Sequence, residues 1–93
     1  MSVFTTETKT EEWLEEEVRN ILMPDGTYKP VRAFKLLWAA RDFLEEHTDV
    51  TEEEIAEIAQ MYVEETSKPY EEAYFDTVGH MDTQIRKRYG LIE

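Results

Sequence analysis

Apolar residues recur at spacings of three and four along most of this chain, and turn-forming residues interrupt the pattern. That spacing places side chains on one side of a helix, whereas a strand buried on one face alternates every second residue. No segment shows a sustained alternation of this second kind. The sequence therefore predicts an all-α protein, a compact four-helix domain with no sheet.

The expected helices are separated by clear breaks, and they cover residues 11–23, 30–47, 52–66 and 70–89, each to within a residue or two. A Pro-Asp-Gly sequence at 24–26 and a Ser-Lys-Pro sequence at 67–69 interrupt the helical pattern. Thr51 and Glu54 form a capping box, which marks the start of the third helix. The second helix is apolar around more than half of its circumference, so we expect it at the centre of the domain.

The chain of 93 residues has room for one domain. We expect residues 1–9 to be a flexible tail and residues 10–93 to form the single helical domain. The sequence has no cysteine and no apolar run of the about 18–20 residues that a membrane-spanning helix needs. Because we also expect no secretory leader, a cytoplasmic location is the default.

Negative charge is concentrated in one part of the chain. Acidic residues outnumber basic ones by 22 to 10, which gives a formal net charge of −12. Between Asp42 and Asp82 there are fourteen acidic side chains and one basic one, Lys68, so this stretch alone carries −13. Such a chain repels the phosphates of nucleic acids, and direct nucleic-acid binding is not expected.

The predicted third helix carries the most regular part of this charge. The residues expected on the side opposite its apolar face are Glu53, Glu54, Glu57, Met61, Glu64 and Glu65. Six carboxylates between Glu52 and Glu65 span roughly 20 Å of helix, about one per 3–4 Å, close to the ~3.4 Å between phosphates of one DNA strand. This pattern favours a face that meets a basic partner, and the alternative is a solvated face that keeps the protein soluble.

Three residues stand out from the helical pattern. Phe75 falls on the polar side of the fourth helix, where it would serve an interface; the alternatives are that the expected helix phase is displaced or that Phe75 packs against Phe4 or Trp13. Trp13 also lies off the apolar stripe of its helix. Arg41, at the edge of the apolar arc of the second helix, is expected to pair with Glu45 one turn on, and the alternative is an arginine at an interface.

The sequence offers little for catalysis. Its two histidines, His47 and His80, each lack a glutamate three residues earlier, so the Glu-x-x-His pairs of helix-bundle di-metal sites are missing. There is no cysteine nucleophile, and the three glycines are isolated, so no phosphate-binding loop is encoded. We expect no catalytic residue, no metal and no cofactor, and therefore not an enzyme.

The charge pattern predicts a small acidic non-enzymatic binding protein that covers a basic surface of another macromolecule, such as a nucleic-acid-handling enzyme. A nucleic-acid-mimicking inhibitor, of the sort that phages and mobile elements encode, fits this description. The expected partner-binding residues are Glu53, Glu54, Glu57, Met61, Glu64, Glu65, Glu72, Phe75 and Asp76. The competing hypothesis is a structural or assembly subunit of a homo-oligomer or larger complex, in which the acidic face serves solubility.

Overall fold

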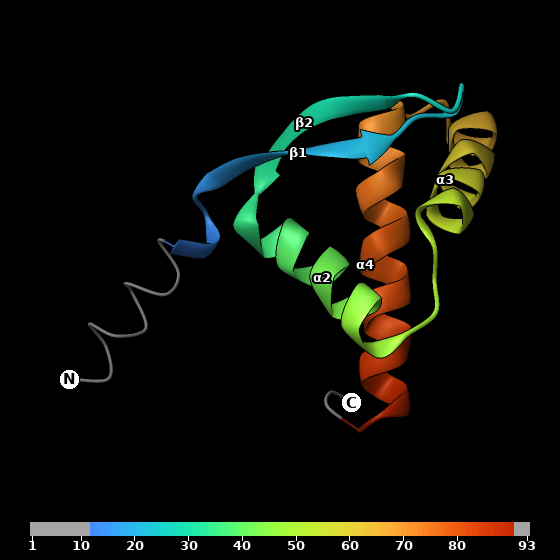
Figure 1. Cartoon of the computed structure of the whole chain (residues 1–93). Helices are drawn as coiled ribbons and strands as arrows, with labels where there is room; N and C mark the ends of the chain where they lie inside the picture. Colours follow the sequence, from blue (N-terminus) through green and yellow to red (C-terminus); the bar gives the residue numbers. More distant parts are fainter. Residues whose placement is uncertain (1–11, 91–93) are drawn as a thin grey trace.

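The computed structural model describes residues 12–90, in which a two-stranded antiparallel sheet packs on three helices (Figure 1). The elements, with the labels of Figure 1, are β1 (Glu16–Leu22), β2 (Tyr28–Phe34), α2 (Lys35–His47), α3 (Glu52–Thr66) and α4 (Tyr70–Arg88). The prediction of a four-helix all-α domain without a sheet is therefore wrong, because residues 16–22 and 28–34 form the two strands of a sheet. The predicted tail at 1–9 lies outside the described residues.

A β-hairpin replaces the helix predicted at 11–23 and the first residues of the helix predicted at 30–47. The Pro-Asp-Gly sequence joins its two strands: Gly26 has a positive φ of 87°, which favours glycine because it has no Cβ. The Met23 N–H donates to the Thr27 carbonyl at 2.7 Å, and the Asp25 carboxylate accepts the Thr27 hydroxyl at 2.6 Å. The break between two expected helices is thus the turn of a hairpin.

The hairpin buries one of its two faces. Ile21, Val31 and Ala33 point towards the helices and are buried, whereas Val18 and Phe34 on the outer face are about half exposed. A helix at 11–23 would have placed Val18 and Ile21 together on one buried stripe. The hairpin instead buries Ile21 from its first strand with Val31 and Ala33 from its second. The structure has Pro30 within β2 opposite Asn20, at a position where an antiparallel strand directs its N–H outward and a proline costs no ladder bond.

The two later helices match their predicted bounds closely. The capping box of α3 is present: the Thr51 hydroxyl oxygen accepts the Glu54 N–H at 3.2 Å, and the Glu54 carboxylate accepts the Thr51 N–H at 3.2 Å. Gly90, just beyond α4, has a φ of 72°, as expected of the residue that follows a helix. Sequence reasoning therefore placed α3 and α4 correctly.

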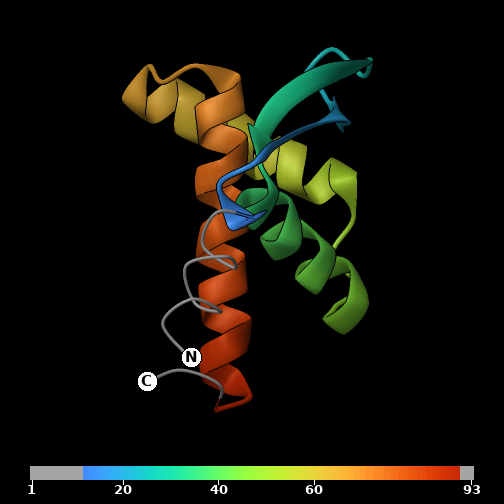
Figure 2. The same ribbon diagram turned by 90° about the vertical axis from the view of Figure 1, so that its left-hand side faces the viewer.

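The central helix is α4 and not α2, as Figures 1 and 2 show: α4 runs the height of the molecule, and both α2 and α3 pack against it. The hairpin and α3 lie near the end where α4 begins (Figures 1 and 2). The buried apolar core is formed by Ile21, Val31, Ala33, Trp38, Leu44, Ile55, Ala59, Ala73, Tyr74 and Val78. Within residues 12–90, no helix is long and apolar enough to cross a bilayer.

Candidate functional site

A partly buried polar network fixes the start of α3 against its neighbours. Glu52 Oε1 accepts a hydrogen bond from Arg41 Nε at 2.6 Å and one from the Tyr74 hydroxyl at 2.8 Å. Its other oxygen lies 3.3 Å from the N–H of Leu22, whose carbonyl accepts the Tyr70 hydroxyl at 2.6 Å. This Glu52 network therefore joins β1, α2, α3 and α4 through hydrogen bonds to one carboxylate and one backbone position.

The network shifts the ionisation of its members. Burial and then the hydrogen bond and charge of Glu52 raise the pKa of Tyr74 well above its ordinary value. Burial and the charge of Glu52 raise the pKa of Tyr70 to about 12. Burial is the largest single effect on the pKa of Arg41 and lowers it, but the hydrogen bond to Glu52, the charge of Glu52 and the interactions with Tyr74 together outweigh burial and raise this pKa. At neutral pH all three groups are thus held in the protonated form that donates to the network.

The ion pair of Arg41 differs from the predicted one. Its partner is Glu52, eleven residues along the chain, and the expected pairing with Glu45 is wrong. Glu52 in turn points inward and leaves the row of carboxylates to which sequence reasoning assigned it. Its local sequence contains no signal for this, because its partners come from three other elements.

The acidic side of α3 is the part of the predicted site that remains free. We use this name for Glu53, Glu54, Glu57, Met61, Glu64 and Glu65. All six side chains are exposed, and none of the five carboxylates forms an ion pair among residues 12–90. Elsewhere the acidic residues of the −13 stretch are partly neutralised, since Asp42 pairs with Arg19 at 2.8 Å and Asp82 with Arg86 at 3.0 Å.

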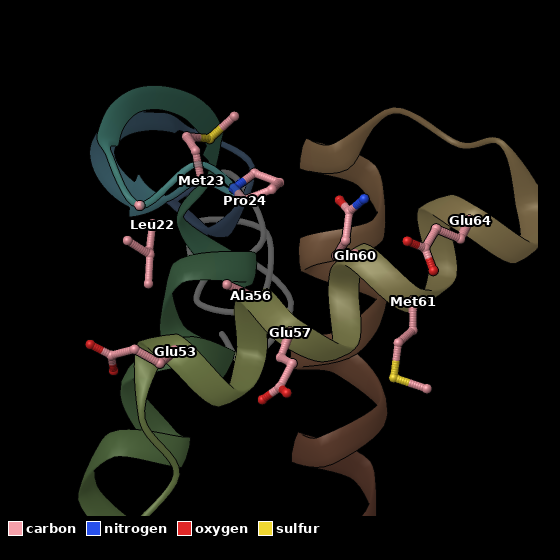
Figure 3. Close-up of a pocket in the computed structure, with 10 residues that line it drawn as sticks. Leu22, Met23, Pro24, Glu53, Ala56, Glu57, Gln60, Met61 and Glu64 are labelled. Atoms are coloured by element: carbon pink, nitrogen blue, oxygen red, sulfur yellow. The ribbon is translucent and has the colours of Figure 1, made fainter.

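A pocket of about 450 Å³ lies between α3 and the turn of the hairpin (Figure 3). The hairpin contributes apolar side chains, and α3 contributes four residues of its acidic side together with two others. The lining residues are Leu22, Met23, Pro24, Gly26, Glu53, Ala56, Glu57, Gln60, Met61 and Glu64. A hollow lined by both apolar side chains and the carboxylates of Glu53, Glu57 and Glu64 suits a ligand that has an apolar part and a positive charge.

The predicted site residues on α4 do not join this pocket. Asp76 pairs with Lys68 at 2.7 Å, and Glu72 is exposed. Phe75 is partly buried, with its ring edge-on to Trp38 at 5.0 Å and to Tyr74 at 5.2 Å between centroids. The interior alternative for Phe75 therefore describes its position, although its partners are not the ones expected.

A second pocket, of about 200 Å³, opens beside the Glu52 network. It is lined by Arg19, Asn20, Trp38, Arg41, Asp42, Glu45, Glu52 and Tyr74. Arg19 lies over the Trp38 ring, 5.5 Å from its centroid, and also pairs with Glu17 and Asp42. Most of the charged groups around this hollow are thus already committed to one another.

No group of three or more metal-ligating side chains is found among residues 12–90. The arrangement that remains available to a partner is a row of unpaired carboxylates beside an apolar pocket, which suits binding. Comparison with known proteins adds nothing to this geometry: no family model, no curated protein and no solved structure matches the chain.

Proposed function

We propose that this protein is a small non-enzymatic binding protein that covers a basic surface of another macromolecule with the acidic side of α3. One observation carries the proposal: Glu53, Glu57, Met61 and Glu64 line the larger pocket, and the three carboxylates among them are exposed and form no ion pair within the described residues. Charge of one sign steers a basic partner and sets its orientation, whereas a buried apolar contact supplies most of the affinity. The pocket beside the carboxylates supplies a place for that contact.

The pocket narrows the chemistry of the partner. An apolar side chain flanked by lysines or arginines would place its apolar part against Met23, Pro24 and Ala56, and its charges near Glu57 and Glu64. Arginine and lysine themselves have apolar stems, so a basic residue can also fill such a hollow with its own stem. We therefore propose a basic, partly apolar protein segment as the ligand, and not a nucleic acid.

Nucleic-acid mimicry is the narrower form of this proposal. With Glu52 turned inward, five carboxylates remain over the twelve steps from Glu53 to Glu65, about one per 4–5 Å at ~1.5 Å per residue. This spacing is wider than the ~3.4 Å of phosphates along a DNA strand. The carboxylate spacing therefore supports a basic protein surface as the target but does not specifically support mimicry of DNA. The cytoplasmic location also stays a prediction.

A labelled peptide with one leucine between two pairs of lysines tests the proposal by fluorescence anisotropy. We expect Glu57→Lys or Glu64→Lys to weaken binding roughly threefold to tenfold each, since an exposed ion pair is worth about 0.2–1 kcal/mol and the reversal adds repulsion. Glu12→Lys changes the net charge by the same amount at an exposed position outside α3 and the pocket, and it should change the dissociation constant by less than about twofold. Equal effects of all three substitutions would reject a localised site.

A second peptide tests the contribution of the pocket. Replacing the leucine by serine keeps the four lysines, and it should weaken binding to the unmodified protein while leaving the steep salt dependence in place. Equal affinity for the two peptides would remove the pocket from the proposal. A pull-down that compares the unmodified protein with the Glu57→Lys variant then tests mimicry. If the protein mimics a nucleic acid, the proteins that bind the unmodified protein but not the variant must include nucleic-acid-binding proteins.

A further inference from the structure

The outer face of the hairpin is the second exposed surface of note. Eight large apolar residues are prominently exposed in the described part of the chain, and six of them fall between residues 13 and 36. These six are Trp13, Leu14, Val18, Tyr28, Phe34 and Leu36. Val18, Tyr28 and Phe34 share the outer face through their strand positions, while Leu14 and Leu36 adjoin the end where β1 begins and β2 ends.

This part of the chain carries no net charge. Between residues 12 and 41 there are five acidic and five basic side chains, in contrast to the −13 of the stretch that follows. Two copies of the protein repel one another through their acidic parts, but contact through the hairpin faces brings together a region without net charge. Charge therefore selects this face for a contact between like molecules.

The open edges of the sheet favour contact through the face over pairing along a strand. Pro30 removes an N–H donor from the free edge of β2. At the free edge of β1, Leu22 is already bonded through its N–H to Glu52 and through its carbonyl to Tyr70. Both edges are thus interrupted, while the face between them is open.

Four outer-face residues form a self-complementary square. The register places Glu16 opposite Phe34 and Val18 opposite Arg32, so the two charges occupy one diagonal and the two apolar side chains the other. Neighbours in this square are about 5 Å apart across the strands and about 7 Å along them. A two-fold axis along the apolar diagonal would place each Glu16 against the partner's Arg32 and each Phe34 against its own copy.

We propose that the protein forms a symmetric homodimer through the outer face of its hairpin, centred on this square. An aromatic side chain that is half exposed in the monomer contributes about 100 Å² of buried surface to an interface when a partner covers it. With Val18, Tyr28 and Phe34, the adjoining Leu14 and Leu36 and the intervening polar residues, the contact approaches the about 800 Å² per partner of a standard interface. The dimer leaves the acidic side of α3 free, so it is independent of the proposed binding of a basic partner.

Sedimentation velocity over a wide concentration range, with the full chain, tests the dimer. The unmodified protein should pass from monomer to dimer, and Val18→Lys should raise the dissociation constant about 10- to 100-fold because it brings two unpaired charges into the contact. Met61→Lys is the matched control, since Met61 is 55% exposed against 50% for Val18 and lies on α3. It should leave self-association unchanged.

Charge exchange tests the orientation of the two copies. Glu16→Arg and Arg32→Glu should each weaken the dimer, because each places like charges together twice, and the double variant should restore it. A protein that stays monomeric at all concentrations would overturn the proposal. A dimer that Val18→Lys leaves intact would do so too, since its contact would then lie elsewhere, and failure of the double variant to recover would overturn the two-fold arrangement.

Discussion

Glu52→Gln is the substitution with the largest expected effect on stability, because it removes the charge on which the Glu52 network depends. The variant keeps the size of the side chain but leaves the guanidinium of Arg41 without its carboxylate. The side chains of Arg41 and Glu52 are only 12% and 21% exposed, so solvent replaces the lost interaction poorly. Arg41 Nη1 is buried and already has no hydrogen-bond partner among the described residues, which leaves the group little else to bind.

The magnitude follows from this partial burial. Breaking a fully buried pair costs about 3–5 kcal/mol, so we expect about 2–3 kcal/mol for this partly buried one. For a domain of this size each kcal/mol lowers Tm by about 4–8 °C, which gives a shift of roughly 10–20 °C. Urea and thermal unfolding followed by circular dichroism measure both quantities.

Glu53→Gln is the matched control for this experiment. Glu53 is the next residue in the same first helical turn, is exposed, and forms no ion pair among residues 12–90. Its replacement should cost less than about 1 kcal/mol, the value of one charge near a helix N-terminus. In Glu52→Gln/Arg41→Met, which removes both charges, the loss should be at least about 1 kcal/mol smaller than the sum of the single losses. Equal losses for Glu52→Gln and Glu53→Gln would refute this reasoning.

Three further predictions concern the core, the turn and the pH dependence. Trp38→Phe should cost about 1–3 kcal/mol in urea unfolding, since it removes both volume and the indole N–H that donates at 2.8 Å to a β1 carbonyl. Gly26→Ala should destabilise by about 1–2 kcal/mol because of its φ of 87°. Gly79→Ala should stabilise by about 0.5–1 kcal/mol, because Gly79 lies within α4 and nothing lies within 4 Å of a Cβ added there. The same sign for both substitutions would contradict the turn geometry. The contribution of Tyr70 and Tyr74 to stability should be constant up to about pH 10, where tyrosines of the unfolded chain begin to ionise, and should be lost as the pH rises towards 12, because the folded state holds both protonated. Tyr70→Phe should reduce that alkaline loss, and urea midpoints that stay level over this range would exclude the effect.

The later half of the fold was predictable because its signals are local. The capping box at Thr51 and the Ser-Lys-Pro sequence at 67–69 act within a few residues of the boundaries they set, and α3 and α4 begin where they indicate. The core side of α4 also follows helical spacing, since Tyr74 and Val78, four residues apart, are each 1% exposed. Capping and periodicity suffice where a helix has one buried face.

The hairpin could not be recognised in the same way because part of its inner face is charged. Glu17 and Arg19 alternate with exposed residues and point inward with Ile21, but charged side chains conceal a period of two in the sequence. Arg19 is placed there by its contacts with Trp38 and Asp42 of α2. These contacts are distant in sequence, so they become visible only when the chain is folded.

The candidate site likewise has one part that follows from local sequence and another that depends on residues distant in the chain. The exposed carboxylates of α3 follow from helix phase alone, and the structure has them exposed as expected. The pocket beside them needs Met23 and Pro24 from the hairpin turn, which helical reasoning placed between two helices. The inward turn of Glu52 likewise depends on Arg41 and Tyr74.

A nuclear magnetic resonance titration of the isotope-labelled protein with the leucine–lysine peptide most directly tests whether α3 and the hairpin turn form one binding surface. We expect amide shift changes that saturate with peptide and concentrate at residues 22–26 and 53–64, which line the larger pocket. Residues 16, 18, 32 and 34, on the outer hairpin face, should change little. Shifts spread evenly over the acidic residues, or centred on the hairpin face, would contradict a binding surface at α3.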